Sequence, residues 1–193
     1  MTVSAVAERA MTLDEFLSFL EERPNGERWT LDDGLPSMNA QPTRRHDWIQ
    51  TNILMALRAY RQRHRPAWRP SGPSQVPVPG ADRTVAPDVL VAPDGGRDDV
   101  SVTPDPIVVF EILSRSDTRA KQARRCADYE AVASIRHYVT VRQDRRAVSA
   151  YRRAADGRLA ADGIDDQSGA VTLDAIGVTL TLAEIYDDTP LAT

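Results

Sequence analysis

Two residue types that often carry catalytic or structural chemistry are almost missing from this sequence. Of its 193 residues one is a cysteine, Cys126, and one is a lysine, Lys121, whereas arginine occurs 23 times. A single cysteine excludes an internal disulfide and any zinc site built from several cysteines. Lysine is a compact charge whose pKa can be lowered, unlike that of arginine. The lone lysine is therefore a candidate for chemistry, the alternative being one surface charge among many.

Long apolar runs and histidine clusters are also missing. No apolar run approaches the roughly 20 residues of a membrane span. Residues 1–10 lack the basic start and the apolar stretch of a secretory signal. The histidines, His46, His64 and His137, are scattered, which argues against a histidine-based metal site. We therefore expect a cytoplasmic protein without membrane association. Cys126 is expected to be a small, half-buried residue of a helix.

Charge is distributed unevenly along the chain, although the net charge is only −4. Residues 1–40 carry 3 basic and 8 acidic side chains, and residues 154–193 carry 1 and 8. The middle segment, residues 41–153, carries 20 basic and 12 acidic side chains. A basic segment of this kind suits a phosphate-bearing substrate, whereas the alternative interpretation is ordinary solvated surface.

The hydrophobic periodicity predicts a mixed β-sheet flanked by helices, an α/β fold. We expect one domain over residues 1–193, in which residues 154–193 form an acidic C-terminal β-hairpin and a short helix. Capping boxes at Thr12 and Thr181 predict helix starts. The expected helices are 12–23, 44–64, 117–133 and a short one after 181. The expected strands are 28–31, 35–38, an edge strand at 75–78, 85–91, 107–113, 136–141 and 147–151, and a hairpin of 158–162 with 170–173.

Two acids lie within short apolar runs at the centre of the sequence. Asp88 begins one run and Glu111 lies inside the next, and a loop rich in Pro, Gly and Asp joins them. If the runs form an antiparallel hairpin in which Ala92 faces Ile107, Asp88 faces Glu111 on one side of the sheet. Opposed like charges are destabilising unless a cation or a shared proton offsets them.

The pair is therefore a candidate metal site. A carboxylate inside an apolar strand must be paired, bind a metal or be neutral. Two carboxylates with open coordination positions suit Mg²⁺, with Mn²⁺ as a substitute. The alternatives are a turn acid at Asp88 and a salt bridge to an arginine at Glu111.

One helix face after the second acid is densely charged. Asp117, Lys121, Arg125 and Asp128 recur at spacings of four, four and three residues, which places them on one side of a helix. An ordinary network of surface ion pairs would give the same pattern. The proximity of this face to Glu111 makes Lys121 a candidate catalytic residue.

Several short motifs follow one another in the order and spacing of a known family. They are Pro87-Asp88, Glu111-Ile112-Leu113-Ser114, Ser116-Asp117-Thr118-Arg119, Tyr129 and Arg136-His137-Tyr138-Val139-Thr140-Val141. Over about residues 12–144, which include the Asp33-Gly34 hairpin and His46, the chain resembles the Uma family of "putative restriction endonucleases" in the PD-(D/E)XK nuclease superfamily. The resemblance implies a restriction-endonuclease-like fold and a Mg²⁺-dependent phosphodiesterase site, with Asp88 and Glu111 as metal-binding acids. We expect DNA as the partner and a homodimer.

The chain departs from the family pattern at the usual lysine. The position two residues after the glutamate is Leu113, and the family commonly moves the lysine to the next helix, where this chain has Arg125. Lys121 lies one helical turn away and is expected to supply the amine, while Arg125 clamps a phosphate, since arginine cannot act as a base.

Three functions remain open at this point. The first is a metal-dependent endodeoxyribonuclease of restriction type. The second is a nuclease-fold protein with weakened catalysis that binds nucleic acid or a protein partner. The third is another carboxylate-pair enzyme such as a glycosidase, for which the three scattered tryptophans give little support.

Overall fold

The computed structural model describes residues 10–24, 27–95, 102–114, 117–161 and 169–192. Its centre is a six-stranded mixed sheet in the order β10-β9-β8-β7-β6-β3. The strands β7 and β8 run parallel and the other neighbours antiparallel. The predicted α/β sheet is therefore confirmed. Its strands are β3 (Trp68–Ser71), β6 (Val89–Pro93), β7 (Val108–Leu113), β8 (His137–Arg142), β9 (Val148–Arg153) and β10 (Leu159–Ala161).

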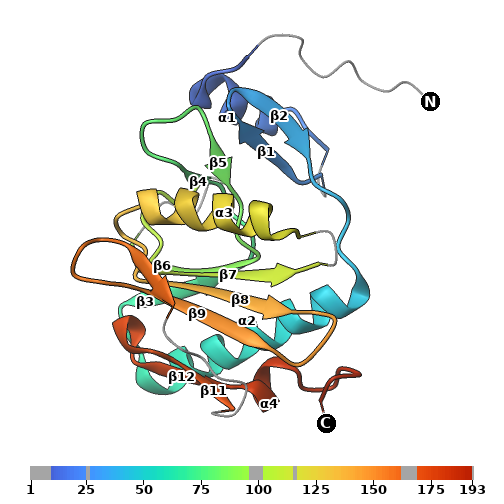
Figure 1. Ribbon diagram of the computed structural model, residues 1–193, viewed down its shortest axis with the longest axis vertical. Helices are drawn as coiled ribbons and strands as arrows, with labels where there is room; N and C mark the ends of the chain where they lie inside the picture. Colours follow the sequence, from blue (N-terminus) through green and yellow to red (C-terminus); the bar gives the residue numbers. More distant parts are fainter. Residues whose placement is uncertain (1–9, 25–26, 96–101, 115–116, 162–168, 193) are drawn as a thin grey trace.

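Helices and a separate C-terminal hairpin cover the two faces of this sheet, as Figure 1 shows. The helix α3 (Arg119–Ala131) connects β7 to β8 and covers one face. The other face is covered by α2 (Arg44–His64), by the antiparallel hairpin of β11 (Ala170–Leu173) and β12 (Val178–Thr181), and by α4 (Leu182–Ile185).

Alternate residues of the central strands serve the two faces. Val89 pairs with Phe110 in the β6–β7 ladder, which confirms the predicted hairpin register. Val89 and Phe110 belong to the cluster shared with α2, whereas Leu90 and Val109 belong to the cluster shared with α3. Glu111 follows Phe110, so the pleat directs it to the α3 face.

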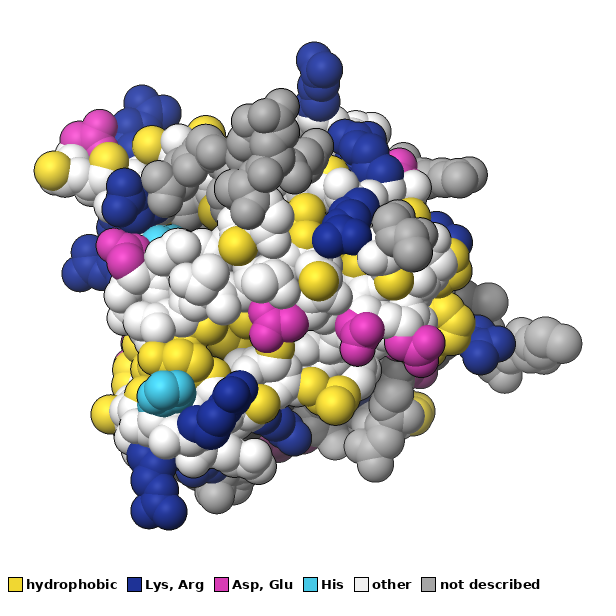
Figure 2. Space-filling view, turned by 90° about the horizontal axis from the view of Figure 1, so that it is seen from below, with side chains coloured by type: hydrophobic (Ala, Val, Ile, Leu, Met, Phe, Trp, Pro, Cys, Tyr) yellow, Lys and Arg dark blue, Asp and Glu magenta, His cyan; other side chains and the backbone are white. Residues whose placement is uncertain are grey.

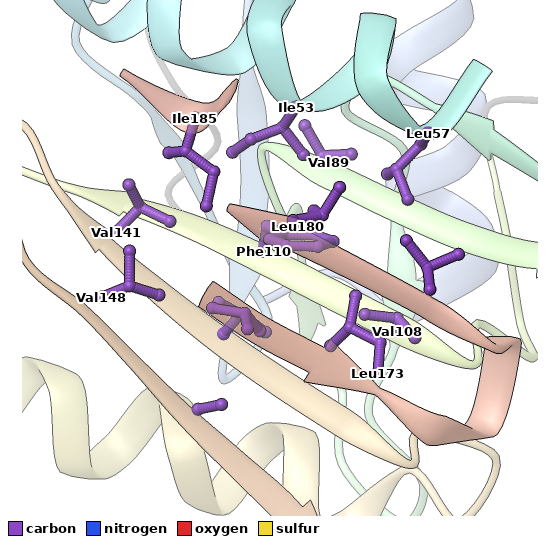
Figure 3. Close-up of a cluster of buried hydrophobic side chains, with 14 of the residues drawn as sticks. Ile53, Leu57, Val89, Val108, Phe110, Val141, Val148, Leu173, Leu180 and Ile185 are labelled. Atoms are coloured by element: carbon purple, nitrogen blue, oxygen red, sulfur yellow. The ribbon is translucent and has the colours of Figure 1, made fainter. Parts of the chain in front are cut away.

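The larger hydrophobic core lies between the sheet, α2 and the C-terminal hairpin (Figure 3). Ile53 and Leu57 of α2 point toward β7, which contributes Phe110. These three side chains are fully buried, as are most members of the cluster. The apolar stripe of α2 thus has its complement in every second residue of the strands.

An N-terminal module lies beyond α3, on the side away from β11 and β12 (Figure 1). It consists of α1 (Leu13–Glu21) and the hairpin of β1 (Trp29–Asp32) and β2 (Leu35–Met38). The predicted capping box of Thr12 is present. At the hairpin turn Gly34 has φ +80°, and a Cβ there would lie 2.9 Å from that of Ala10. The turn therefore requires glycine.

The module rests on a small ribbon formed by β4 (Val76–Pro77) and β5 (Thr84–Val85). The backbone N–H of Leu31 donates to Thr84 Oγ1 at 3.1 Å, and Gln75 Nε2 donates to the carbonyl of Trp29 at 2.8 Å. These buried hydrogen bonds attach the module to the main domain.

One predicted strand pairing is wrong, and one strand is not predicted by the sequence. The segments 158–162 and 170–173 do not pair with each other, because β10 pairs with β9 and β11 pairs with β12. Asp162 itself lies outside the described residues. The sequence does not predict the edge strand β3, because Pro70 interrupts its strand pattern. Proline is nevertheless tolerated at the edge of a sheet.

The predicted strand 85–91 is divided in the structure, since β5 ends at Val85 and β6 begins at Val89. The helix α2 has the predicted limits, and the capping box of Thr181 opens α4. Cys126 is half-buried. Within the described ranges, no helix combines the length and apolar character needed to cross a membrane.

Candidate active site

A cleft of about 520 Å³ lies between the N-terminal module, the start of α2 and α3. The four residues singled out in the sequence, Asp88, Glu111, Lys121 and Arg125, all line it. Asp88 directly precedes β6 and Glu111 lies within β7, the strand paired with β6, so both acids reach the same cleft. The backbone N–H of Asp88 donates to the carbonyl of Phe110 at 3.0 Å, one residue out of the ladder's register, because Phe110 is already the partner of Val89.

Asp88 is buried and accepts three hydrogen bonds through its side chain. Its Oδ1 lies 3.1 Å from Nε2 of His46 and 3.0 Å from Nη2 of Arg28. Its Oδ2 accepts the backbone N–H of Ile112 at 2.8 Å. Gln50, one turn after His46 on α2, donates to the Asp88 carbonyl at 2.6 Å. The carboxylate is thus held by α2, by β7 and by the N-terminal module.

These partners set the charge state of the pair formed by Asp88 and His46. Burial raises the pKa of Asp88, but the hydrogen bond and charge of His46, together with Ile112 N–H and Arg28, lower it below its usual value. Burial lowers the pKa of His46, yet the hydrogen bond and negative charge of Asp88 raise it above 6.5. Asp88 is therefore ionised at neutral pH.

The pKa of Glu111 is raised, whereas that of Asp88 is lowered. Burial raises the pKa of Glu111 to about 7, opposed by the charge of Arg125 and by the Tyr129 hydroxyl, which donates to Oε1. Nε of Arg125 lies 3.5 Å from the same Oε1. The other oxygen, Oε2, accepts no hydrogen bond from the described residues. Glu111 thus offers one uncommitted oxygen to a ligand.

The structure brings Arg125, and not Lys121, into contact with the acids. Lys121 is exposed at the edge of the cleft and forms no ion pair with the described residues. Nη2 of Arg125 also lies 3.4 Å from Oδ1 of Asp117, whose Oδ2 accepts both the N–H and the hydroxyl of Ser114 at 2.6 Å. Arg125 is therefore fixed between two carboxylates.

A second ion-pair network joins the N-terminal module to α3 along the cleft. Arg83 pairs with Asp128 at 2.6 Å and also with Asp32 and Asp33 at the turn of the module. Arg124 pairs with the same two turn acids. The four charged residues of the predicted helix face all line the cleft, although Asp117 precedes the first residue of α3. Ser116, the first residue of the Ser116-Asp117-Thr118-Arg119 motif, lies outside the described residues.

Comparison with protein families gives a match over residues 13–183 to the profile of Uma2, described as "Putative restriction endonuclease". The chain belongs to the Uma2 family. Its fold is similar to the crystal structure of "a putative nuclease belonging to DUF820" from Anabaena variabilis. The two share 16% sequence identity with a TM-score of 0.71, over 91% of this chain and 97% of the other. Comparison with curated proteins gave no match.

The donor set of this Uma2 site fits a hard divalent cation. No group of three or more His, Cys, Asp and Glu side chains suited to a metal occurs within the described ranges. An ion would therefore rest on Asp88 and Glu111, with water and substrate oxygens completing its shell, as is usual for Mg²⁺. The free Oε2 of Glu111 and the second lone pair of Asp88 Oδ2 provide oxygens for it.

The expected basic surroundings are present but largely neutralised. Five basic and five acidic residues line the cleft, and four of the basic residues are ion-paired, namely Arg28, Arg83, Arg124 and Arg125. Figure 2 shows the molecule from below the view of Figure 1, with a row of acidic side chains near the centre and basic side chains around it. Among the described basic residues of the cleft, Lys121 is the one without an ion pair.

Sequence reasoning missed the residues that hold Asp88. His46 and Gln50 are polar residues four apart beside the apolar stripe of α2, a signal that could have been used. Tyr129 lies four residues after Arg125 and so shares its helix face. Arg28 gives no such signal, because it is 60 residues away from Asp88 in the sequence.

Proposed function

We propose that this Uma2 protein is a Mg²⁺-dependent DNA endonuclease of restriction type. The observation that supports the proposal is that two buried acids, Asp88 and Glu111, line one cleft. Family membership and the nuclease-like fold support phosphodiester hydrolysis as the reaction.

In this proposal Asp88 and Glu111 hold the cation, and each has its own support. When bound, a divalent ion lowers the pKa of a bound water and neutralises charge developing on the phosphate. His46 and Ile112 N–H orient the Asp88 carboxylate, while Tyr129 orients that of Glu111. Such outer partners fix the direction of metal-binding oxygens.

The two cations of α3 have different roles. Arg125 holds Glu111 in place and balances its charge, but it cannot accept a proton from water. Lys121, which is exposed and unpaired with the described residues, contacts a phosphate of the DNA at the cleft edge. This differs from the sequence-based hypothesis, in which Lys121 is the catalytic amine.

A second candidate function is binding of nucleic acid without efficient cleavage. The specific observation in its favour is the Arg125–Glu111 contact, which puts a guanidinium where the family commonly has a lysine. A glycosidase, the third possibility, is not supported by membership of the Uma2 family.

A supercoiled-plasmid assay with Mg²⁺, Mn²⁺ or EDTA separates the two functions. An endonuclease nicks or linearises the plasmid with either metal, is silent in EDTA, and loses cleavage in Glu111→Ala. Retarded mobility of the plasmid without any nicking in either metal would favour the binding function. Equal nicking by wild type and Glu111→Ala would show that the cleavage arises elsewhere.

A further inference from the structure

Asp88 Oδ1 accepts hydrogen bonds from two side chains that differ in burial. His46 comes from within α2, and only 9% of its side chain is exposed. Arg28 precedes β1 in the N-terminal module, and 26% of its side chain is exposed. Both contacts are close to 3 Å, so together they use both lone pairs of Oδ1.

A divalent ion on Asp88 changes the electrostatics of this arrangement. A guanidinium beside the carboxylate neutralises a charge that the ion would otherwise bind, and guanidinium and ion repel each other at this distance. Ile112 N–H and His46 are hydrogen-bond donors of the kind that normally orient a ligating carboxylate. Arg28 is the donor that competes with the ion, because it carries a full positive charge.

A phosphate of the substrate would offer Arg28 a second hydrogen-bond acceptor. The Nε of Arg28 is buried and has no hydrogen-bond partner in the described residues. Arginine binds phosphate oxygens through two parallel N–H groups. A DNA phosphate brought into the cleft by the cation would satisfy the Nε and the Nη2 that has left Asp88.

We propose that Arg28 balances the charge of Asp88 in the metal-free protein and moves to a substrate phosphate when the divalent ion binds. The inference rests on the proposed function. It makes Arg28 a substrate-binding residue that also lowers the affinity of the empty site for metal. It follows that removal of Arg28 should affect metal binding and DNA binding in opposite directions.

The first measurement is calorimetric titration with Mn²⁺ in the absence of DNA. Arg28→Met should bind Mn²⁺ about tenfold more tightly than wild type, because a charged hydrogen bond no longer competes. Arg124→Met is the matched control, since Arg124 also joins the N-terminal module to the cleft but contacts Asp32 and Asp33 instead of Asp88. It should leave the Mn²⁺ affinity unchanged.

The second measurement is affinity for a short DNA duplex with Ca²⁺, another hard oxygen-binding cation, and with EDTA. Arg28→Met should weaken binding about tenfold in Ca²⁺ and change it little in EDTA, where Arg28 of the wild type remains on Asp88. Arg28→Lys, which keeps the charge without the two-pronged donor, should show intermediate values and serves as a second variant with a milder change.

Thermal unfolding of each variant without metal checks that the module remains folded. Equal Mn²⁺ affinity in wild type and Arg28→Met would overturn the inference while leaving the metal site intact. Loss of affinity for both Mn²⁺ and DNA would also overturn it, since Arg28 would then only support the fold. Absence of Mn²⁺ binding in wild type and in Arg28→Met would overturn both the inference and the proposed function.

Discussion

The two faces of the central sheet use alternate residues of the same strands for different purposes. Toward α2, Phe110 and its neighbours form a core of buried apolar side chains. Toward α3, the next residue of the same strand is Glu111, a buried acid bonded to Tyr129. Successive residues of β7 point to opposite faces of the sheet. Phe110 therefore belongs to the core that stabilises the fold, and Glu111 belongs to the candidate site.

This separation shows how a costly polar group can be tolerated. Burial of Glu111 is unfavourable by itself, and the pairing with Arg125 and Tyr129 offsets only part of that cost, since its pKa remains about 7. The α2 face compensates with an extensive apolar cluster. Substitutions at adjacent residues of β7 should consequently have opposite effects on stability.

The largest effect on the free energy of unfolding is expected from a substitution on the α2 face. Phe110→Ala should lower the free energy of unfolding by about 3–5 kcal/mol, because it removes a fully buried ring from close-packed neighbours. Denaturant unfolding measures this loss. A loss below about 1 kcal/mol would contradict the view that this face stabilises the fold.

A smaller effect of opposite sign is expected on the α3 face. Between its ordinary pKa of 4.5 and its raised value of about 7, Glu111 keeps a proton in the folded protein that the unfolded chain has released. The wild type should thus lose stability as pH rises through this range, by at most about 3 kcal/mol, and then level off. Glu111→Gln should lack this fall and be the more stable protein at pH 8.

Unfolding in EDTA at pH 5 and pH 8 tests this expectation, because a bound cation would stabilise ionised Glu111. The difference between wild type and Glu111→Gln should change with pH in the stated direction. Parallel stabilities at both pH values would mean that Glu111 is not a destabilised acid.

The smallest effect concerns the edge of the cleft. Lys121→Met should weaken DNA binding and reduce the magnitude of the log–log salt slope by about 0.9, the value for one phosphate contact. Arg124→Met is the control, because Arg124 lies on the same helix but is paired with Asp32 and Asp33. Binding measured from low to moderate salt should separate the variants. Identical slopes in both would remove the proposed role of Lys121.

The features that could be predicted from the sequence are local. The capping box of Thr12 fixes a helix start within four residues, and the limits of α2 follow from its own apolar stripe. The register of the β6–β7 hairpin also proved predictable, since two apolar strands set it, and both Asp88 and Glu111 line one cleft.

The features that could not be predicted depend on distant contacts. The partner of β11 is decided by packing against α2 and not by its own sequence. The choice between Lys121 and Arg125 depends on how α3 is rotated above the sheet, and the buried Tyr129 fixes that rotation by bonding to Glu111. The Arg28–Asp88 contact requires the placement of a whole module.

The edges of the central sheet limit how copies of this chain can assemble. At one edge β3 contains Pro70, which has no backbone N–H to offer, and Arg61 already donates to the carbonyl of Trp68. At the other edge β10 has only three residues. Neither edge is a good template for a further strand, which protects the protein from sheet-to-sheet aggregation. The homodimer expected from the sequence would accordingly join through helices or loops, leaving each six-stranded sheet separate.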